Sequence, residues 1–173
     1  MSDRSTASNP HFGSLKAYIR AAGEGYRVDG PVGGDVIFKA RSADTGGMLM
    51  AMENHVHPGE GPPLHLHPSE DEYFWVLEGE FRFRTNNDVA TAGTGAFVFV
   101  PRGTPHCFQN VGAQLGRLLV LFTPSGMESF YENLAQLKGD RSPEAFARAG
   151  SDAKMQVVGP TLAESHPRTT DAC

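Results

Sequence analysis

The stretch GEGPPLHLHPSEDEYFWVLEG, residues 59–79, carries His65, His67 and Glu72 at fixed spacing between Gly59 and Gly79. Its pattern is G-x5-H-x-H-x4-E-x6-G, in which His65, His67 and Glu72 are the residues that carry chemistry. Successive side chains of a β-strand alternate between its two faces, so histidines at i and i+2 point the same way. We therefore expect both imidazoles to face one site.

A second stretch, GAFVFVPRGTPHCFQN at residues 95–110, adds a third histidine in the pattern G-x5-P-x-G-x2-H-x3-N. Neutral imidazole suits divalent iron, nickel, copper and zinc, and a carboxylate extends the choice to manganese. We predict one divalent transition metal (Fe, Mn, Ni, Co, Cu or Zn) held by His65, His67, Glu72 and His106. Three imidazoles and one carboxylate leave one or two positions open for a substrate oxygen, water or dioxygen.

The composition favours a single globular domain that does not bind nucleic acid. The chain has 173 residues and a net charge of −5 at pH 7, which disfavours contact with phosphate backbones. The two cysteines, Cys107 and Cys173, do not suggest a disulfide framework, so a cytoplasmic location is expected. The first ten residues are polar, and we expect neither a secretory signal nor a membrane span.

Many short strands are expected across the first two thirds of the chain. Apolar runs between turn signals predict strands over residues 36–41, 48–56, 73–77, 81–84, 97–100, 106–111 and 117–122. The unbroken apolar run from Tyr73 to Leu77 predicts a strand buried on both faces. Turns are expected at 42–47 and at 86–88, where Ser, Gly, Asn and Asp favour chain reversal.

The apolar periodicity becomes helical after Ser125. Residues 125–128, Ser-Gly-Met-Glu, have the form of a capping box, and apolar residues follow at helical spacing to Leu137. Ser142-Pro143-Glu144 predicts a second short helix that ends near Gly150. Together the elements predict an all-β jelly-roll barrel with short C-terminal helices. We expect a disordered N-terminal arm at 1–13, the barrel at 14–124, a helical extension with a final strand-like segment at 125–162, and a tail at 163–173.

Strand alternation also predicts the walls of a pocket beside the metal. If Glu72 and His106 point inward, the residues two and four positions further along the same strands do so as well. The expected lining, in which the two methionines or their odd-numbered neighbours form one wall, is Phe38, Met50, Met52, Phe74, Val76 and Phe108. Such a pocket would accept a flat, mostly apolar molecule with adjacent oxygens. The same side chains are equally compatible with simple filling of the barrel core.

Two neighbouring features have plainer explanations than a second site. His55 and His57 repeat the H-x-H form, but no glutamate follows at the matching distance, so a solvated strand end is favoured. Cys107 follows a predicted ligand and should point away from the metal. It has no evident basic neighbour to stabilise a thiolate, so inert packing is expected.

Both histidine blocks match the cupin signature at every fixed position, and the chain resembles the small single-domain cupins of the quercetin 2,3-dioxygenase-like group. The similarity extends over roughly residues 15–162 and includes FKA at 38–40, DTGG at 44–47, GPPLH at 61–65 and VVGP at 157–160. It implies the cupin double-stranded β-helix, a jelly-roll barrel, with the four metal ligands named above. It also implies that Glu72 is a catalytic base, since an apolar pocket raises the proton affinity of a carboxylate.

The resemblance implies a metal-dependent dioxygenase that acts on a flavonol-like, aromatic or polyketide-like enol, with dioxygen as co-substrate. Two alternatives remain open because one ligand set serves many reactions. One is a non-oxidative isomerase, cyclase or decarboxylase in which Glu72 moves a proton; the other is a small-molecule-binding cupin without turnover. The expected partners are a small-molecule substrate and a second copy of the chain in a homodimer, with no nucleic acid and no membrane.

Overall fold

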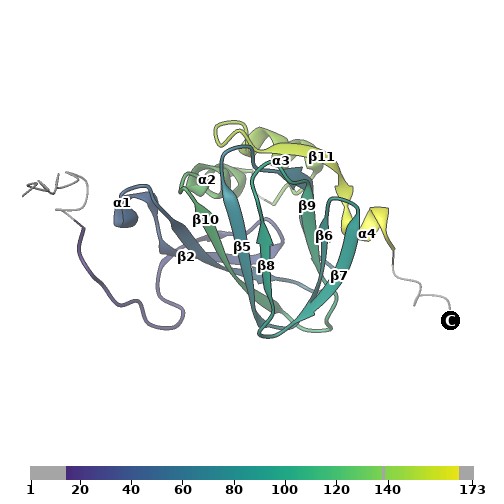
Figure 1. The fold of residues 1–173 in the computed structure, drawn as a ribbon, viewed down its shortest axis with the longest axis horizontal. Helices are drawn as coiled ribbons and strands as arrows, with labels where there is room; N and C mark the ends of the chain where they lie inside the picture. The colour runs from purple at the N-terminus through teal and green to yellow at the C-terminus, as the bar shows by residue number, and fades with distance from the viewer. Residues whose placement is uncertain (1–14, 138, 168–173) are drawn as a thin grey trace, which may run out of the picture.

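The computed structural model describes residues 15–137 and 139–167 (Figure 1). The expected N-terminal arm at 1–13 and the last part of the expected tail, 168–173, lie outside these residues. The strands of the described part are β1 Tyr26–Asp29, β2 Gly33–Ala40, β3 Met50–Val56, β4 Pro63–Leu66, β5 Asp71–Glu78, β6 Glu80–Thr85, β7 Asp88–Gly93, β8 Phe97–Val100, β9 His106–Asn110, β10 Gly116–Thr123 and β11 Gln156–Thr161. Its helices are α1 Ser42–Thr45, α2 Glu128–Gln136, α3 Pro143–Ala149 and α4 Leu162–Ser165.

Two antiparallel sheets form the barrel around one core. One sheet has the strand order β1-β2-β3-β10-β5-β8, and the other has the order β11-β4-β9-β6-β7. In β10 the alternate residues Leu118, Val120 and Phe122 are buried, whereas the residues between them are half-buried. This alternation is typical of an antiparallel strand with one face on the core. The predicted all-β jelly-roll class is confirmed.

The sheet register brings the two histidine blocks together. The pairing of β4 with β9 places His65 directly opposite His106. β5 lies in the other sheet, between β10 and β8, where Glu72 pairs with Phe122 on one side and Val100 on the other. Ligands predicted from separate parts of the sequence therefore come from both sheets of the barrel.

The prediction that the strand from Tyr73 to Leu77 is buried on both faces is wrong. In β5 the residues Phe74 and Val76 are buried, but Tyr73 is half-buried and Trp75 is 48% exposed. The opposite sheet covers only the inner face of β5, so the outer residues lie at the surface. An apolar run without alternation therefore misrepresents a strand whose outer face is itself aromatic.

The helices α2 and α3 lie together over one end of the barrel, and α3 contacts β11 (Figure 1). The second of them begins as predicted, because the Ser142 hydroxyl accepts a hydrogen bond from the Ala145 N–H at 3.2 Å. The capping box expected at Ser125 is not formed, since α2 begins at Glu128 after Met127 without a side-chain cap. We call α2, α3 and the turn to β11 the helical cover, residues 128–155.

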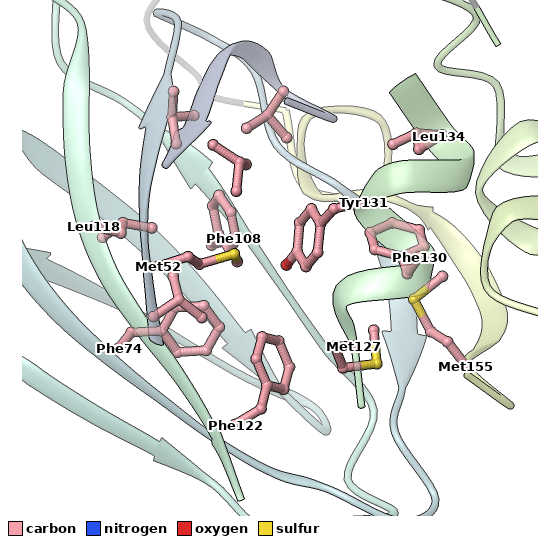
Figure 2. Close-up of a cluster of buried hydrophobic side chains, with 14 of the residues drawn as sticks. Met52, Phe74, Phe108, Leu118, Phe122, Met127, Phe130, Tyr131, Leu134 and Met155 are labelled. Carbon is pink, nitrogen blue, oxygen red and sulfur yellow. The ribbon is translucent and has the colours of Figure 1, made fainter. Parts of the chain in front are cut away.

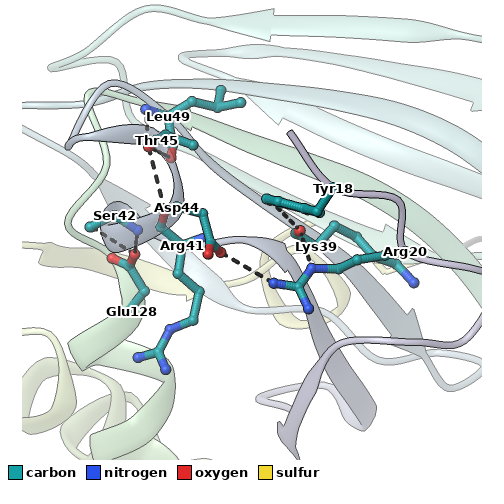
Figure 3. Close-up of polar contacts among 9 residues, drawn as sticks. All are labelled: Tyr18, Arg20, Lys39, Arg41, Ser42, Asp44, Thr45, Leu49 and Glu128. Atoms are coloured by element: carbon teal, nitrogen blue, oxygen red, sulfur yellow. Dashed lines mark hydrogen bonds and ion pairs between the residues drawn. The ribbon is translucent and has the colours of Figure 1, made fainter. Parts of the chain in front are cut away.

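The carboxylate of Glu128 turns instead toward α1, as Figure 3 shows. Its Oε1 accepts hydrogen bonds from the backbone N–H of Ser42 at 2.5 Å and from the Ser42 hydroxyl at 2.7 Å. This contact ties the start of the helical cover to the segment that follows β2.

Several short elements were not predicted from the sequence. The expected turn at 42–47 contains α1, the start of the expected tail contains α4, and β1 and β7 form additional edge strands. Thr161 caps α4 with a capping box, and Leu162 is fully buried. Within residues 15–137 and 139–167, no helix has the length and apolar character needed to cross a bilayer.

Candidate metal centre

The four predicted ligands converge inside the barrel. His65, His67, Glu72 and His106 are all buried, and one donor atom from each lies within 4.8 Å of the donor atoms of the others. The ring centroids of His65 and His106 are 4.4 Å apart, and those of His67 and His106 are 5.5 Å apart. The spacing pattern in the sequence therefore corresponds to one compact group of side chains.

Backbone carbonyls orient two of the imidazoles. The Nδ1 atom of His65 lies 2.8 Å from the carbonyl oxygen of Pro63, and that of His106 lies 2.9 Å from the carbonyl oxygen of Thr104. A carbonyl oxygen only accepts, so each ring carries its proton on Nδ1 in the neutral form. The lone pairs of the two Nε2 atoms are then available for a metal, which is the usual arrangement of ligating histidines.

Burial favours the neutral form of His65. Desolvation holds the pKa of its imidazole well below the ordinary value, and the nearby His106 and His67 lower it further. A neutral imidazole is the form that binds a divalent metal.

Glu72 is ionised in this environment. Desolvation alone would raise the pKa of its carboxyl group, but the contacts with His106 and His67 outweigh this effect and hold the pKa well below its usual range. Its Oε2 atom lies 2.7 Å from His106 Nε2 and 3.2 Å from His67 Nε2. Burial in the pocket does raise the proton affinity of Glu72, as expected, but the contacts with His106 and His67 outweigh it, so the net pKa is lowered.

The donor set fits a divalent metal. Within the described part of the chain, His67 Nδ1 has no hydrogen-bond partner and Nε2 makes only the 3.2 Å contact with Glu72, although the side chain is 3% exposed. The 2.7 Å approach of His106 Nε2 to the Glu72 carboxylate requires a proton or a metal cation between or beside the two atoms, because both would otherwise present lone pairs. Three imidazoles and a carboxylate are a common ligand set for first-row transition metals.

Hydrogen bonds connect the loop before His106 to the two segments that carry His67 and Glu72. Asp71 accepts hydrogen bonds from the backbone N–H of Arg102 at 2.9 Å and from its guanidinium at 2.9 and 3.0 Å. These hydrogen bonds lower the pKa of Asp71 to about 2. The Gly103 N–H also donates to the carbonyl oxygen of His67 at 2.7 Å. Asp71 therefore supports the site without pointing into it.

A narrow cavity extends from the metal centre toward the helical cover; the surrounding space of about 380 Å³ includes solvent outside its mouth. Figure 2 shows Met52, Phe74 and Phe108 of the barrel on one side and Phe130, Tyr131 and Met155 of the cover on the other. The complete lining is Pro31, Val32, Met52, Asn54, Pro62, His65, His67, Glu72, Phe74, Phe108, Val120, Phe130, Tyr131, Phe146 and Met155. The ligands thus form a polar pole in a mostly apolar space, which is typical of small-molecule sites.

The structure separates the six predicted pocket residues into two groups. Three of them line this cavity: Met52, Phe74 and Phe108. The other three are fully buried in the core and lie outside the cavity lining: Phe38, Met50 and Val76. Phe38 still contacts the cover, since its ring packs edge-on against Tyr131 with centroids 5.9 Å apart.

Sequence reasoning missed the lining residues of the cover and one polar residue of the barrel. The helical spacing in α2 indicates an apolar face but not the surface that this face covers, so Phe130 and Tyr131 were not placed in the pocket. Asn54 could have been found, because it continues the inward alternation of Met50 and Met52 along β3. Burial and the charge of Glu72 raise the pKa of Tyr131 well above its ordinary value, so its hydroxyl keeps its proton.

Comparison with known structures agrees with the fold. Residues 52–122 match the family model described as "Cupin domain", a segment that contains all four candidate ligands. An RmlC-like cupin from Shewanella frigidimarina NCIMB 400 has a TM-score of 0.55 and 21% sequence identity, over 66% of this chain and 96% of that one. The prediction of a cupin jelly-roll fold is confirmed.

Several curated proteins with different named functions match part of this chain. The tetracenomycin polyketide synthase protein TcmJ of Streptomyces glaucescens is 31% identical over 80 residues, which are 46% of this chain and 52% of TcmJ. Oxidoreductase iacF of Pestalotiopsis fici is 43% identical over 49 residues, 28% of this chain and 24% of that protein. Mannose-1-phosphate guanylyltransferase ManC of Salmonella typhimurium is 31% identical over 74 residues, 43% of this chain and 15% of ManC. The chain therefore spans at most about half the length of these relatives.

Proposed function

We propose that this chain, whose residues 52–122 match the cupin domain, is a metal-dependent dioxygenase of quercetinase-like type. Its substrate would be a flavonol-like, aromatic or polyketide-like enol. The observation that carries the proposal is the group of three imidazoles and one carboxylate at the polar pole of an apolar, aromatic cavity. Such a cavity suits a flat molecule that presents its oxygens at one end.

The residues of the chain would have distinct tasks in this reaction. A divalent metal, when bound, supplies Lewis acidity and electron exchange with dioxygen. Phe74 and Phe108 offer ring faces and edges that orient a flat substrate toward the ligands. The ionised carboxylate of Glu72, whose pKa is low, would accept the proton of an enol hydroxyl made more acidic by a bound metal. The helical cover, through Phe130 and Tyr131, keeps water from the reacting end.

The names of two relatives support this class of reaction over simple binding. TcmJ is named as a polyketide synthase protein and iacF as an oxidoreductase. Polyketide chemistry produces aromatic enols of the kind the cavity suits, and an oxidoreductase name is compatible with oxygen chemistry. Both matches cover only part of the proteins concerned.

Oxygen uptake is the direct test. Protein reconstituted separately with each of the six candidate metals is offered quercetin and smaller enols in an oxygen electrode, with metal-free protein and His65→Ala as controls. The proposal expects uptake with at least one metal, stoichiometric with substrate loss, and no uptake in either control. Turnover that proceeds equally well without oxygen would contradict it and favour a non-oxidative isomerase, cyclase or decarboxylase. Recovery of unchanged ligand with every metal would favour a binding protein.

We further propose a cytoplasmic homodimer. The outer face of β5 and the edge strand β8 carries an outer aromatic patch of Tyr73, Trp75, Phe97 and Phe99, with the Tyr73 and Phe99 rings stacked at 5.1 Å. Trp75, Phe97 and Phe99 are each about half exposed, and contiguous exposed aromatic surface is typical of an interface. Light scattering should give twice the monomer mass, and Trp75→Ser with Phe97→Ser should restore the monomer. A monomer at high concentration would contradict the proposal.

A further inference from the structure

Asn54 is a buried polar residue in the wall of the cavity. It lies on β3, between the inward-facing Met52 and Val56, and it is 3% exposed. Its backbone pairs with Leu118 on one side and with Val36 on the other, so a central strand of the sheet holds it in place. Its side chain lines the same cavity as the metal centre.

The side-chain oxygen of Asn54 lacks a partner. Among the residues that the structure describes, no group makes a hydrogen bond with Asn54 Oδ1, although this atom is buried. A buried acceptor left unpaired is unfavourable, so natural proteins rarely keep one without a use. An apolar residue of similar size would avoid this cost at the same place. Asn54 is therefore better explained by a ligand that supplies the missing donor.

No other residue of the cavity wall, among those that the structure describes, donates a hydrogen bond to Asn54 Oδ1. Apart from the metal ligands, the lining residues are apolar except for Asn54 and Tyr131. Tyr131 comes from α2 of the helical cover, whereas Asn54 belongs to the barrel sheet. The cavity thus presents three polar features to a substrate: the metal centre, the Tyr131 hydroxyl of the helical cover, and an amide held by a central strand of the barrel sheet.

We propose that Asn54 is a specificity residue that selects substrates bearing a hydroxyl group away from the oxygens that meet the metal centre. The substrate hydroxyl donates a hydrogen bond to Asn54 Oδ1. The inference rests on the proposed function for the metal end of the substrate and adds the chemistry of its other end. A site built to pair a substrate hydroxyl discriminates strongly against the analogue that lacks it, because the amide is then left unpaired.

A matched pair of small enols tests this inference. Kojic acid and allomaltol share one hydroxypyranone chelating group and differ only by a hydroxyl at the far end. Calorimetry measures the binding of each to zinc-loaded wild-type protein, to Asn54→Leu and to Gln109→Met. Gln109 is the control because it also has an unpaired buried oxygen but lines a different hollow. Asn54→Ala, which adds no bulk, repeats the test, and zinc stoichiometry shows that each variant keeps its metal centre.

The wild type and Gln109→Met should bind kojic acid on the order of 10-fold more tightly than allomaltol, which corresponds to about 1.4 kcal/mol. In Asn54→Leu the preference should disappear while allomaltol binds as tightly as before. Equal affinities in the wild type, or a preference that survives in both Asn54 variants, would overturn the role of Asn54 and leave the proposed function standing. If the zinc-loaded wild type binds neither compound, the metal centre does not bind the oxygens of an enol. The proposed function is then contradicted, and this inference is contradicted with it.

Discussion

The contact between Glu128 and Ser42 allows a prediction whose size follows from the geometry. Glu128 is 8% exposed, and its Oε1 accepts hydrogen bonds from the Ser42 N–H at 2.5 Å and the Ser42 hydroxyl at 2.7 Å (Figure 3). Hydrogen bonds to a charged group contribute roughly 1.5–3 kcal/mol each, and both are only partly buried, so the lower value applies. Glu128→Ala should therefore lower the free energy of unfolding by about 3 kcal/mol. For a domain of this size, Tm should fall by about 6–12 °C.

Urea titrations followed by circular dichroism measure this loss. Glu128→Gln keeps the acceptor oxygen but loses its charge, so it should cost about half as much. The matched control is Glu132→Ala, one helical turn further along α2, where the carboxylate pairs with Arg41 at 2.5 Å but is 37% exposed. A surface ion pair of this kind contributes about 0–1 kcal/mol.

The double-mutant cycle of Ser42→Ala with Glu128→Ala isolates the hydroxyl contribution and should give a coupling of about 1 kcal/mol. If Glu128→Ala costs no more than Glu132→Ala, the argument from burial and bond number is refuted.

The remaining predictions concern the metal centre, one glycine and the buried thiol. A divalent metal at about 100 times its Kd should raise the free energy of unfolding by about 2.7 kcal/mol, and calorimetry should show no such gain in His65→Ala; an unchanged wild type would argue against a site. A Cβ at Gly61 would lie 1.8 Å from the Phe108 carbonyl oxygen, so urea titrations should show a loss of about 3 kcal/mol for Gly61→Ala. Gly59→Ala meets nothing within 4 Å and should cost only about 1 kcal/mol for its φ of +80°; equal costs would disprove the steric reason. Burial raises the pKa of Cys107 to about 11, so between pH 9 and 11 the unfolded thiol loses a proton that the folded thiol keeps. Stability should then fall by up to about 1.4 kcal/mol per pH unit, a decline that Cys107→Ala should lack.

The candidate metal ligands could be predicted because the spacing that identifies them lies within short segments of the chain. His65 and His67 are two residues apart on one chain segment, and strand alternation alone directs them to one face. The partner strands of Glu72 and His106 depend on register, which the sequence does not state, and here the resemblance to cupins supplied the missing arrangement. The structure brings together the same four side chains that the sequence predicted as ligands.

The polar contacts of the cover could not be predicted in the same way. The carboxylate of Glu128 meets a residue 86 positions earlier in the chain, whereas a capping box assumes a partner three residues away. Local hydrogen bonds and distant ones compete, and only the three-dimensional packing decides between them. For the same reason, the apolar run from Tyr73 to Leu77 could not indicate that just one of its faces would be covered.

The metal ligands span two sheets, and this has a consequence for the life of the protein in a cell. His65 and His106 lie on the short β4–β9 pairing, while Glu72 belongs to the opposite sheet, so a bound ion would join the two sheets of the barrel. Chains made when metal is scarce would lack this link and would spend a larger fraction of their time unfolded. Cellular proteases remove unfolded chains continuously. The abundance of the protein would then follow the supply of its metal, even with synthesis held constant.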